Sequence, residues 1–291
     1  MSSMVVRSLS TVGVVLLLAA GCTTPTSVAS STPKASASAG VPATHLTPAV
    51  SSGTAASSAS AAPSPSTSAG GEQPLAGRTI VIDPGHNGGW TAKFGYRKVP
   101  DGNGHLKACN SSGTATNGGY AEHAYNWAQA NALAGVLRAR GATVRLTRSS
   151  DTGKGPCVNK RASLANTLRA DLLISIHADG NLGKGHRGFH VIMSPVMHGG
   201  KAVYARSKAL AGDVRASLQQ GAGMPRSNYI GKGTAFSVRS DLGTLNFAQV
   251  PAVMMEMGNM RNASDAKLFG SASWREKAAT ALADGIATFL G

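Results

Sequence analysis

Beyond about residue 77, the chain alternates between short apolar runs and longer segments with apolar residues at helical spacing. Unbroken apolar runs rich in β-branched residues are typical of strands buried on both faces of a sheet. The predicted strands are 79–83, 143–147, 172–176, 189–193 and 251–255, and the predicted helices are 118–140, 158–170, 201–220 and 273–290. Strands that alternate with helices predict an α/β fold, here a three-layer domain with a twisted, largely parallel sheet flanked by helices.

Polar residues with metal-binding or catalytic chemistry directly follow three of the predicted strands. The apolar run 80–82 is stopped by Asp-Pro-Gly, and His86 comes next. In the same way, His177 follows the run 172–176 and Glu256 follows the run 251–255. Open α/β sheets place their ligand sites at the carboxyl ends of strands. We therefore expect His86, His177 and Glu256 to form one site.

Two histidines and one carboxylate leave a coordination position open for water, which is the ligand set of a catalytic zinc ion. Glu122 is the expected third ligand, because it lies in the first turn of the predicted helix 118–140. His123 is the alternative, but neighbouring helical residues face about 100° apart, so only one of the two would point at a metal. Four other histidines lie on presumed loops or strand faces and are not expected to be ligands, at positions 105, 186, 190 and 198.

The first 22 residues resemble an export signal. Arg7 is followed by the apolar stretch 12–20, which is too short to be a comfortable membrane span. The end of this stretch, Leu-Ala-Ala-Gly-Cys22, resembles the lipobox of bacterial lipoproteins, in which the cysteine is lipidated. We therefore predict an exported protein anchored by lipid at Cys22 to the outer face of the cytoplasmic membrane. An ordinary cleaved signal with an incidental cysteine is the alternative.

Residues 23–76 are almost entirely Ser, Ala, Thr and Pro, and this composition predicts a disordered tether. The chain carries a net charge of +15, nearly all of it beyond the tether, since the first 76 residues hold only Arg7, Lys34 and Glu72. This excess indicates an anionic partner, for which cell-wall polymers or lipid headgroups fit an exported chain. Nucleic acid is not expected, because no nucleic-acid motif is present. A basic surface that serves only solubility is the simpler alternative.

Two cysteines remain after Cys22. Cys109 lies in the segment 88–117, which is rich in Gly, Asn and Ser and is predicted to be a long loop or small hairpin beside the site. Cys157 precedes a predicted helix. An even pair in an exported chain usually forms a disulfide. Metal binding is the alternative, but two isolated thiols make a poor zinc set.

Taken together, these motifs give the chain a resemblance to a known family. Over residues 78–290 it resembles the zinc-dependent N-acetylmuramoyl-L-alanine amidases of peptidoglycan, most closely the compact actinobacterial members. The motifs that carry the resemblance are Ile82-Asp-Pro-Gly-His86, Glu122 with Asn126, Thr147-Arg148 with Asp151, Arg161 with Ala165-Asn166, Ala170-Asp171, Ser175-Ile-His177 and Val250-Pro-Ala-Val-Met-Met-Glu256.

The resemblance implies a catalytic domain at 77–291 that holds one Zn²⁺ with His86, Glu122 and His177 and uses Glu256 as its catalytic carboxylate. The substrate would be peptidoglycan or muropeptides, cut between the lactyl group of N-acetylmuramic acid and the L-alanine of the stem peptide. Arg239, in a loop before the strand that ends at Glu256, could bind a stem-peptide carboxylate. The family usually has Asn where this chain has Asp179, which affects a peripheral contact. We expect a monomer.

Two other functions remain open from the sequence. A different zinc hydrolase, acting on wall peptides or amino sugars, would use the same metal chemistry on another bond. A non-catalytic wall-binding lipoprotein would need no intact site, and the presence of all three expected ligands together with Glu256 argues against it.

Overall fold

The computed structural model describes residues 73–291. The predicted signal segment, Cys22 and nearly all of the predicted tether lie outside the described residues. Among residues 73–291, no helix combines the length and the apolar character that crossing a membrane would require.

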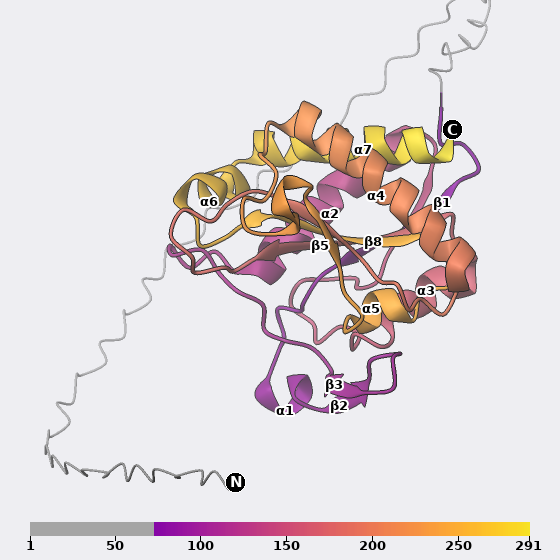
Figure 1. Cartoon of the computed structure of the whole chain (residues 1–291), viewed down its shortest axis with the longest axis horizontal. Helices are drawn as coiled ribbons and strands as arrows, with labels where there is room; N and C mark the ends of the chain where they lie inside the picture. The colour runs from indigo at the N-terminus through magenta and orange to yellow at the C-terminus, as the bar shows by residue number, and fades with distance from the viewer. Residues whose placement is uncertain (1–72) are drawn as a thin grey trace, which may run out of the picture. The chain divides into compact units, whose positions relative to one another are not determined.

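A six-stranded sheet forms the centre of the fold (Figure 1). Its strands lie in the order β4 (Thr143–Leu146), β1 (Thr79–Pro84), β5 (Leu172–Asp179), β8 (Ala252–Asn259), β6 (His190–Met193) and β7 (Phe236–Val238). All neighbouring pairs are parallel except β6 and β8, which are antiparallel. The prediction of a largely parallel sheet is therefore confirmed, and the carboxyl ends of β1, β5 and β8 lie side by side.

Helices cover both faces of the sheet, as a three-layer fold requires (Figure 1). The helices on one face are α2 (Glu122–Ala139), α4 (Gly200–Ala222) and α7 (Ala272–Leu290), and those on the other are α3 (Arg161–Leu168) and α5 (Gly243–Asn246). Successive side chains of β1 point to opposite faces of the sheet, so this strand contributes to the hydrophobic core on each face. Ile80 and Ile82 pack under the first group of helices, and Val81 packs under the second. A further helix, α6 (Ala263–Gly270), packs against α7 and β8.

The segment 88–117 folds as a small unit beside the main sheet. It contains α1 (Ala92–Gly95) and an antiparallel hairpin of β2 (Lys98–Pro100) and β3 (Leu106–Ala108). A disulfide joins Cys109, directly after the hairpin, to Cys157. The Val158 N–H also donates to the Cys109 carbonyl at 2.8 Å. The segment is thereby held against the chain that leads into α3.

Several elements differ from the prediction in length. β5 and β8 continue past His177 and Glu256, because each has a hydrogen-bonded neighbour along that stretch. Helix α2 begins at Glu122 and not at residue 118, and Gly119 before it has a φ of +86°, which no right-handed helix contains. The short elements α1, β7, α5 and α6 were not expected, since three to eight residues show no clear period.

Candidate active site

The turn after β1 brings His86 to the edge of the sheet in an unusual backbone conformation. His86 has a φ of +58°, in the left-handed region that residues with a side chain seldom adopt. Gly85 before it has no room for a side chain, because an added Cβ would lie 2.2 Å from Cε1 of His177. The Gly85 N–H donates to the Ile176 carbonyl at 2.9 Å, which ties the turn to β5. The turn thus sets His86 directly against His177.

Two buried arginines hold this turn in place. Arg161 donates from Nη1 to the Asp83 carboxylate at 2.7 Å and from Nη2 to the His86 carbonyl at 3.1 Å. Arg148 donates from Nε to the Pro84 carbonyl at 2.9 Å. Burial by itself would raise the pKa of Asp83, but the Arg161 charge and the hydroxyls of neighbouring side chains outweigh it and hold that pKa below its usual value. A charged, fully buried ion pair therefore stabilises the strained turn.

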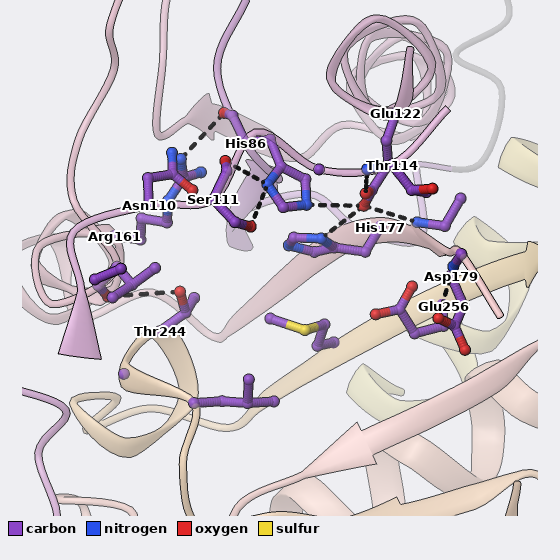
Figure 2. A pocket seen from close by; sticks show the side chains of 18 of the residues that line it. His86, Asn110, Ser111, Thr114, Glu122, Arg161, His177, Asp179, Thr244 and Glu256 are labelled. Atoms are coloured by element: carbon purple, nitrogen blue, oxygen red, sulfur yellow. Dashed lines mark hydrogen bonds and ion pairs between the residues drawn. The ribbon is translucent and has the colours of Figure 1, made fainter. Parts of the chain in front are cut away.

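The side chains of His86, Glu122 and His177 converge at one point (Figure 2). Oε1 of Glu122 lies 3.0 Å from Nε2 of His86 and 3.0 Å from Nδ1 of His177. Their potential ligand atoms all lie within 4.8 Å of one another. Glu122 reaches this point because it occupies the first turn of α2, whose N-terminus faces the ends of β1 and β5.

Neighbouring backbone groups orient two of these side chains. Nδ1 of His86 lies 3.0 Å from the Ser111 carbonyl, which can only accept, so this nitrogen carries a proton and Nε2 is the ring nitrogen directed at Glu122. Oε2 of Glu122 accepts from the Thr114 N–H at 2.9 Å, and Oε1 accepts from the Ala178 N–H at 3.2 Å. Such outer partners fix the ring orientation and basicity of metal-binding side chains.

Charge is unevenly distributed over the three side chains. Burial would raise the pKa of Glu122, but the nearby imidazoles of His86 and His177 outweigh burial and hold this pKa well below its usual value. For His86, the Glu122 carboxylate outweighs burial and raises the pKa. For His177, burial is the largest influence and lowers the pKa. The carboxylate is therefore ionised, as a metal ligand must be.

The residues fit a single divalent cation. Two imidazoles and one carboxylate form the donor set of catalytic zinc sites, which keep one position open. Among residues 73–291, this is the one group of three or more His, Cys, Asp or Glu side chains arranged to share an ion. His123, the alternative to Glu122, lies outside it, since its Nδ1 pairs with the Asp151 carboxylate at 2.9 Å.

Glu256 lies beside this cluster without belonging to it (Figure 2). It pairs in register with His177, on the neighbouring strand β8. Its Oε2 is buried and has no hydrogen-bond partner among the described residues. Burial, followed by the charges of Glu122 and Asp179, raises the pKa of Glu256 well above its usual value. A carboxyl group that has a raised pKa and lies next to a cluster of candidate metal ligands is suited to accept and release a proton.

A pocket of about 450 Å³ opens onto the cluster. His86, Glu122, His177 and Glu256 all line it, so the structure brings the four expected residues to one pocket. Arg239 and Lys107 line the same pocket. The Arg239 guanidinium is held by two hydrogen bonds to Asp241, from Nε at 2.9 Å and from Nη2 at 2.7 Å. Arg239 is therefore paired where it lines the pocket, and its charge acts against the rise in the pKa of Glu256.

Sequence reasoning did not identify several residues that shape the site. Thr114 contributes its backbone N–H, and Ser111 contributes both its carbonyl, 3.0 Å from Nδ1 of His86, and its hydroxyl, 3.2 Å from the same atom. A backbone contribution leaves no side-chain pattern, and a single serine in a segment rich in Gly, Asn and Ser does not stand out. His190 could have been singled out from the sequence, because it is the one polar residue in the apolar run 189–193. It lies opposite Glu256 on β6.

Comparisons with known proteins agree with this geometry. The family model for N-acetylmuramoyl-L-alanine amidase (Amidase_3) matches residues 80–288. The Mycobacterium tuberculosis N-acetylmuramoyl-L-alanine amidase Rv3717 is 43% identical over 217 residues, covering 74% of this chain and 88% of that protein. The crystal structure of the N-acetylmuramyl-L-alanine amidase Ami1 from Mycobacterium smegmatis superposes with a TM-score of 0.70 at 42% identity, over 75% of this chain and 98% of that one. The apo form of Ami1 from Mycobacterium abscessus matches with the same TM-score and identity, over 75% of this chain and all of that one. The resemblance seen in the sequence is confirmed, and the chain belongs to the N-acetylmuramoyl-L-alanine amidase family.

Proposed function

We propose that this protein is a zinc-dependent amidase that hydrolyses the bond between the lactyl group of N-acetylmuramic acid and the L-alanine of the peptidoglycan stem peptide. The observation that carries the proposal is the cluster of His86, Glu122 and His177 with Glu256 beside it in the same pocket. Family membership supports the identity of the bond.

In this proposal, His86, Glu122 and His177 hold one zinc ion. When bound, zinc lowers the pKa of a coordinated water to about 7 and polarises a carbonyl oxygen. The Ser111 carbonyl accepts from Nδ1–H of His86, so Nε2 is the nitrogen of the neutral ring that is available for coordination. The backbone N–H groups of Thr114 and Ala178 donate to the Glu122 carboxylate and fix its orientation.

Glu256 moves the proton. Its carboxylate accepts a proton from the attacking water and returns it to the nitrogen of the departing L-alanine, because an amide nitrogen leaves poorly unless it is protonated. The raised pKa of Glu256 favours the return step. A cation at the neighbouring cluster would oppose that rise and make the carboxylate available as a base. The peptide side of the substrate then lies toward Glu256 and Arg239, whose guanidinium offers a carboxylate partner.

The cellular setting of the proposal comes from the sequence. One relative, from Staphylococcus aureus, is named a probable cell wall amidase, and together with family membership this supports an envelope location for this chain. Export, a lipid at Cys22 and a tether over 23–76 would hold the domain close to the wall. Turnover or remodelling of the wall and the separation of daughter cells are the expected processes.

The test combines metal analysis with product identification. Purified protein should release fragments from muropeptides that carry a free L-alanine amine, as mass spectrometry would show. His86→Ala, Glu122→Ala and His177→Ala should lose both zinc and activity, because three ligands fall to two. Glu256→Ala should keep zinc and lose about 10²–10⁴-fold in turnover.

Other outcomes point to other functions. New peptide termini within the stem, or free amino groups on deacetylated sugars, would indicate one of the alternative zinc hydrolases. A Glu256→Ala protein that cleaves at the wild-type rate would remove Glu256 from the mechanism. If the unaltered protein binds wall fragments and zinc but cleaves nothing, the non-catalytic function applies.

A further inference from the structure

Glu256 has a second polar neighbour in the sheet, on the side away from His177. β6 runs antiparallel to β8, and His190 is the residue directly opposite Glu256. Residues directly opposite each other on adjacent strands point to the same face, with their Cβ atoms about 4.5–5.5 Å apart. The His190 residue is only 4% exposed. Its imidazole therefore lies in the interior, on the same face of the sheet as the Glu256 side chain.

Each of these two side chains has a buried polar atom without a hydrogen-bond partner among residues 73–291. The atoms are Nδ1 of His190 and Oε2 of Glu256. Nearly all buried polar atoms in folded proteins have a partner, so two unpaired atoms on facing side chains need an explanation. An imidazole nitrogen that carries a proton donates, and a carboxylate oxygen accepts, so the two atoms complement each other.

The surroundings of His190 suit a neutral donor. Burial lowers the pKa of His190 to about 4, so the ring carries one proton and no charge at neutral pH. The ring of Tyr229 meets it edge to face, with centroids 6.2 Å apart and planes at 83°. The Tyr229 hydroxyl in turn donates to Oδ2 of Asp179 at 2.8 Å. His190 is thus packed against a residue that is itself held in place.

We propose that His190 is a positioning residue for Glu256, whose Oε2 accepts a hydrogen bond from Nδ1–H of His190 through one buried water or after a small rotation of either side chain, since the two atoms are not bonded to each other in the structure. With Oε2 held, Oε1 is left as the oxygen that faces the pocket and the reacting amide. A neutral donor orients the carboxyl group without adding a positive charge beside a cation site. This inference rests on the proposed function, in which Glu256 transfers the proton.

A matched pair of variants tests the proposal. In His190→Asn, the amide nitrogen stands the same number of bonds from Cα as Nδ1, so a donor is retained at that position. In His190→Leu, a methyl group takes that place and the donor is lost at nearly the same side-chain size. The measurements are kcat and KM for muropeptide cleavage, with zinc content determined on the same samples.

His190→Asn should keep a kcat close to that of the unaltered protein. His190→Leu should lose about 10- to 100-fold in kcat, the usual effect of removing a partner that orients an active-site group. Its KM and zinc content should not change, because neither substrate contacts nor metal ligands are touched. A purely structural role for His190 would alter folding and leave the two kcat values equal, and equal values would overturn the proposal.

Two further results separate this inference from the proposed function. If Glu256→Gln is inactive while His190→Leu is fully active, the proposed function stands and the positioning role falls. If Glu256→Gln retains wild-type activity, both fail together, since His190 acts only through Glu256. If His190→Leu does not fold, His190→Gln replaces it, with its amide nitrogen one bond further out. His190→Asn should then be the more active of the two amides, and equal activity would again overturn the proposal.

Discussion

The two sides of the pocket support their functional side chains in different ways. On the ligand side, formed by the turn after β1, the segment 111–114 and the start of α2, His86 and Glu122 each have partners beyond one another. On the Glu256 side, formed by β8, β6 and Arg239, the buried oxygen of Glu256 has no partner among the described residues. The two side chains on the ligand side can therefore keep their geometry without substrate. On the Glu256 side, the unpaired oxygen can still accept a hydrogen bond from a protein donor, a water or a substrate.

Buried charge accounts for much of this difference. The ligand side contains Arg161, whose side chain is 2% exposed and which is paired with Asp83 in the interior. On the Glu256 side, the arginine whose charge acts on Glu256 is Arg239, whose side chain is 45% exposed and which is paired with the exposed Asp241. Removing one partner of an interior pair is costly because a buried charge is left without its counter-charge, while exposed pairs contribute little to stability. Substitutions on the two sides should consequently fail in different ways.

The largest effect is expected from Gly85→Ala on the ligand side. The added Cβ would lie 2.2 Å from the His177 ring, so the ring has to move away from Glu122. We expect zinc and activity to be lost together, although Gly85 has no side chain of its own. Elemental analysis alongside muropeptide cleavage measures both.

Gly135→Ala is the matched control, since it lies in α2 with nothing within 4 Å of the added Cβ. It should keep full activity and gain up to about 1 kcal/mol in the free energy of unfolding. A Gly85→Ala protein that retains its zinc would show that the turn after β1 can shift to accommodate the added methyl group without loss of the metal site.

Arg161→Leu should lower the free energy of unfolding by about 3–5 kcal/mol, because it leaves the Asp83 carboxylate buried without its counter-charge. Denaturation in urea gives the value. In Arg140→Leu, the pair that is lost involves the half-exposed Asp284, and the cost should be about 1 kcal/mol or less. Equal losses in the two variants would contradict the assigned role of the buried pair.

Replacing both Cys109 and Cys157 with Ser should cost up to about 4 kcal/mol, given the sequence separation of 48 residues. The disulfide precedes Ser111 by two residues, so the carbonyl that orients His86 should also become less well held. We expect weaker zinc binding in a chelator competition, with Glu256 unaffected. Unchanged stability together with unchanged zinc affinity would mean that the hairpin is held by its other contacts.

The smallest effect is expected on the Glu256 side, from Arg239→Gln. Loss of one exposed guanidinium should raise KM roughly fivefold for substrates with a free stem-peptide carboxylate, equivalent to about 1 kcal/mol. Stability should stay the same, because the pair with Asp241 is exposed. Arg206→Gln, on α4 against the Phe289 ring, is the control and should leave KM unchanged. A drop in kcat without a change in KM would argue against substrate binding by Arg239.

Much of the fold and of the site could be predicted because both depend on side-chain type and spacing. The long apolar runs of β1, β5 and β8 are visible in the sequence, and so are the polar residues after them. Glu122 was expected from its place at the start of a helix, and the structure brings it to the two histidines. The roles of these residues in metal binding and catalysis stay predictions.

The remaining features depend on tertiary contacts that no local pattern contains. β7 and α5 have three and four residues, too few to show a period. The nearer of the two oxygens that orient His86 is the backbone carbonyl of Ser111, and a backbone contact cannot be read from the residue type at that position. The pairing of His190 with Glu256 arises from one antiparallel neighbour in an otherwise parallel sheet, which the alternation of strands and helices does not predict.

The position of β8 also bears on the order in which the molecule becomes complete during synthesis. β8 is the last strand in the chain, yet it lies between β5 and β6 in the sheet. A chain that has been made only as far as residue 251 would contain all three candidate metal ligands but not Glu256. It would also leave β6 and β7 without their connection to the rest of the sheet. Proton transfer at the proposed site thus becomes available only after the C-terminal segment has inserted into the middle of the fold, a late, long-range step.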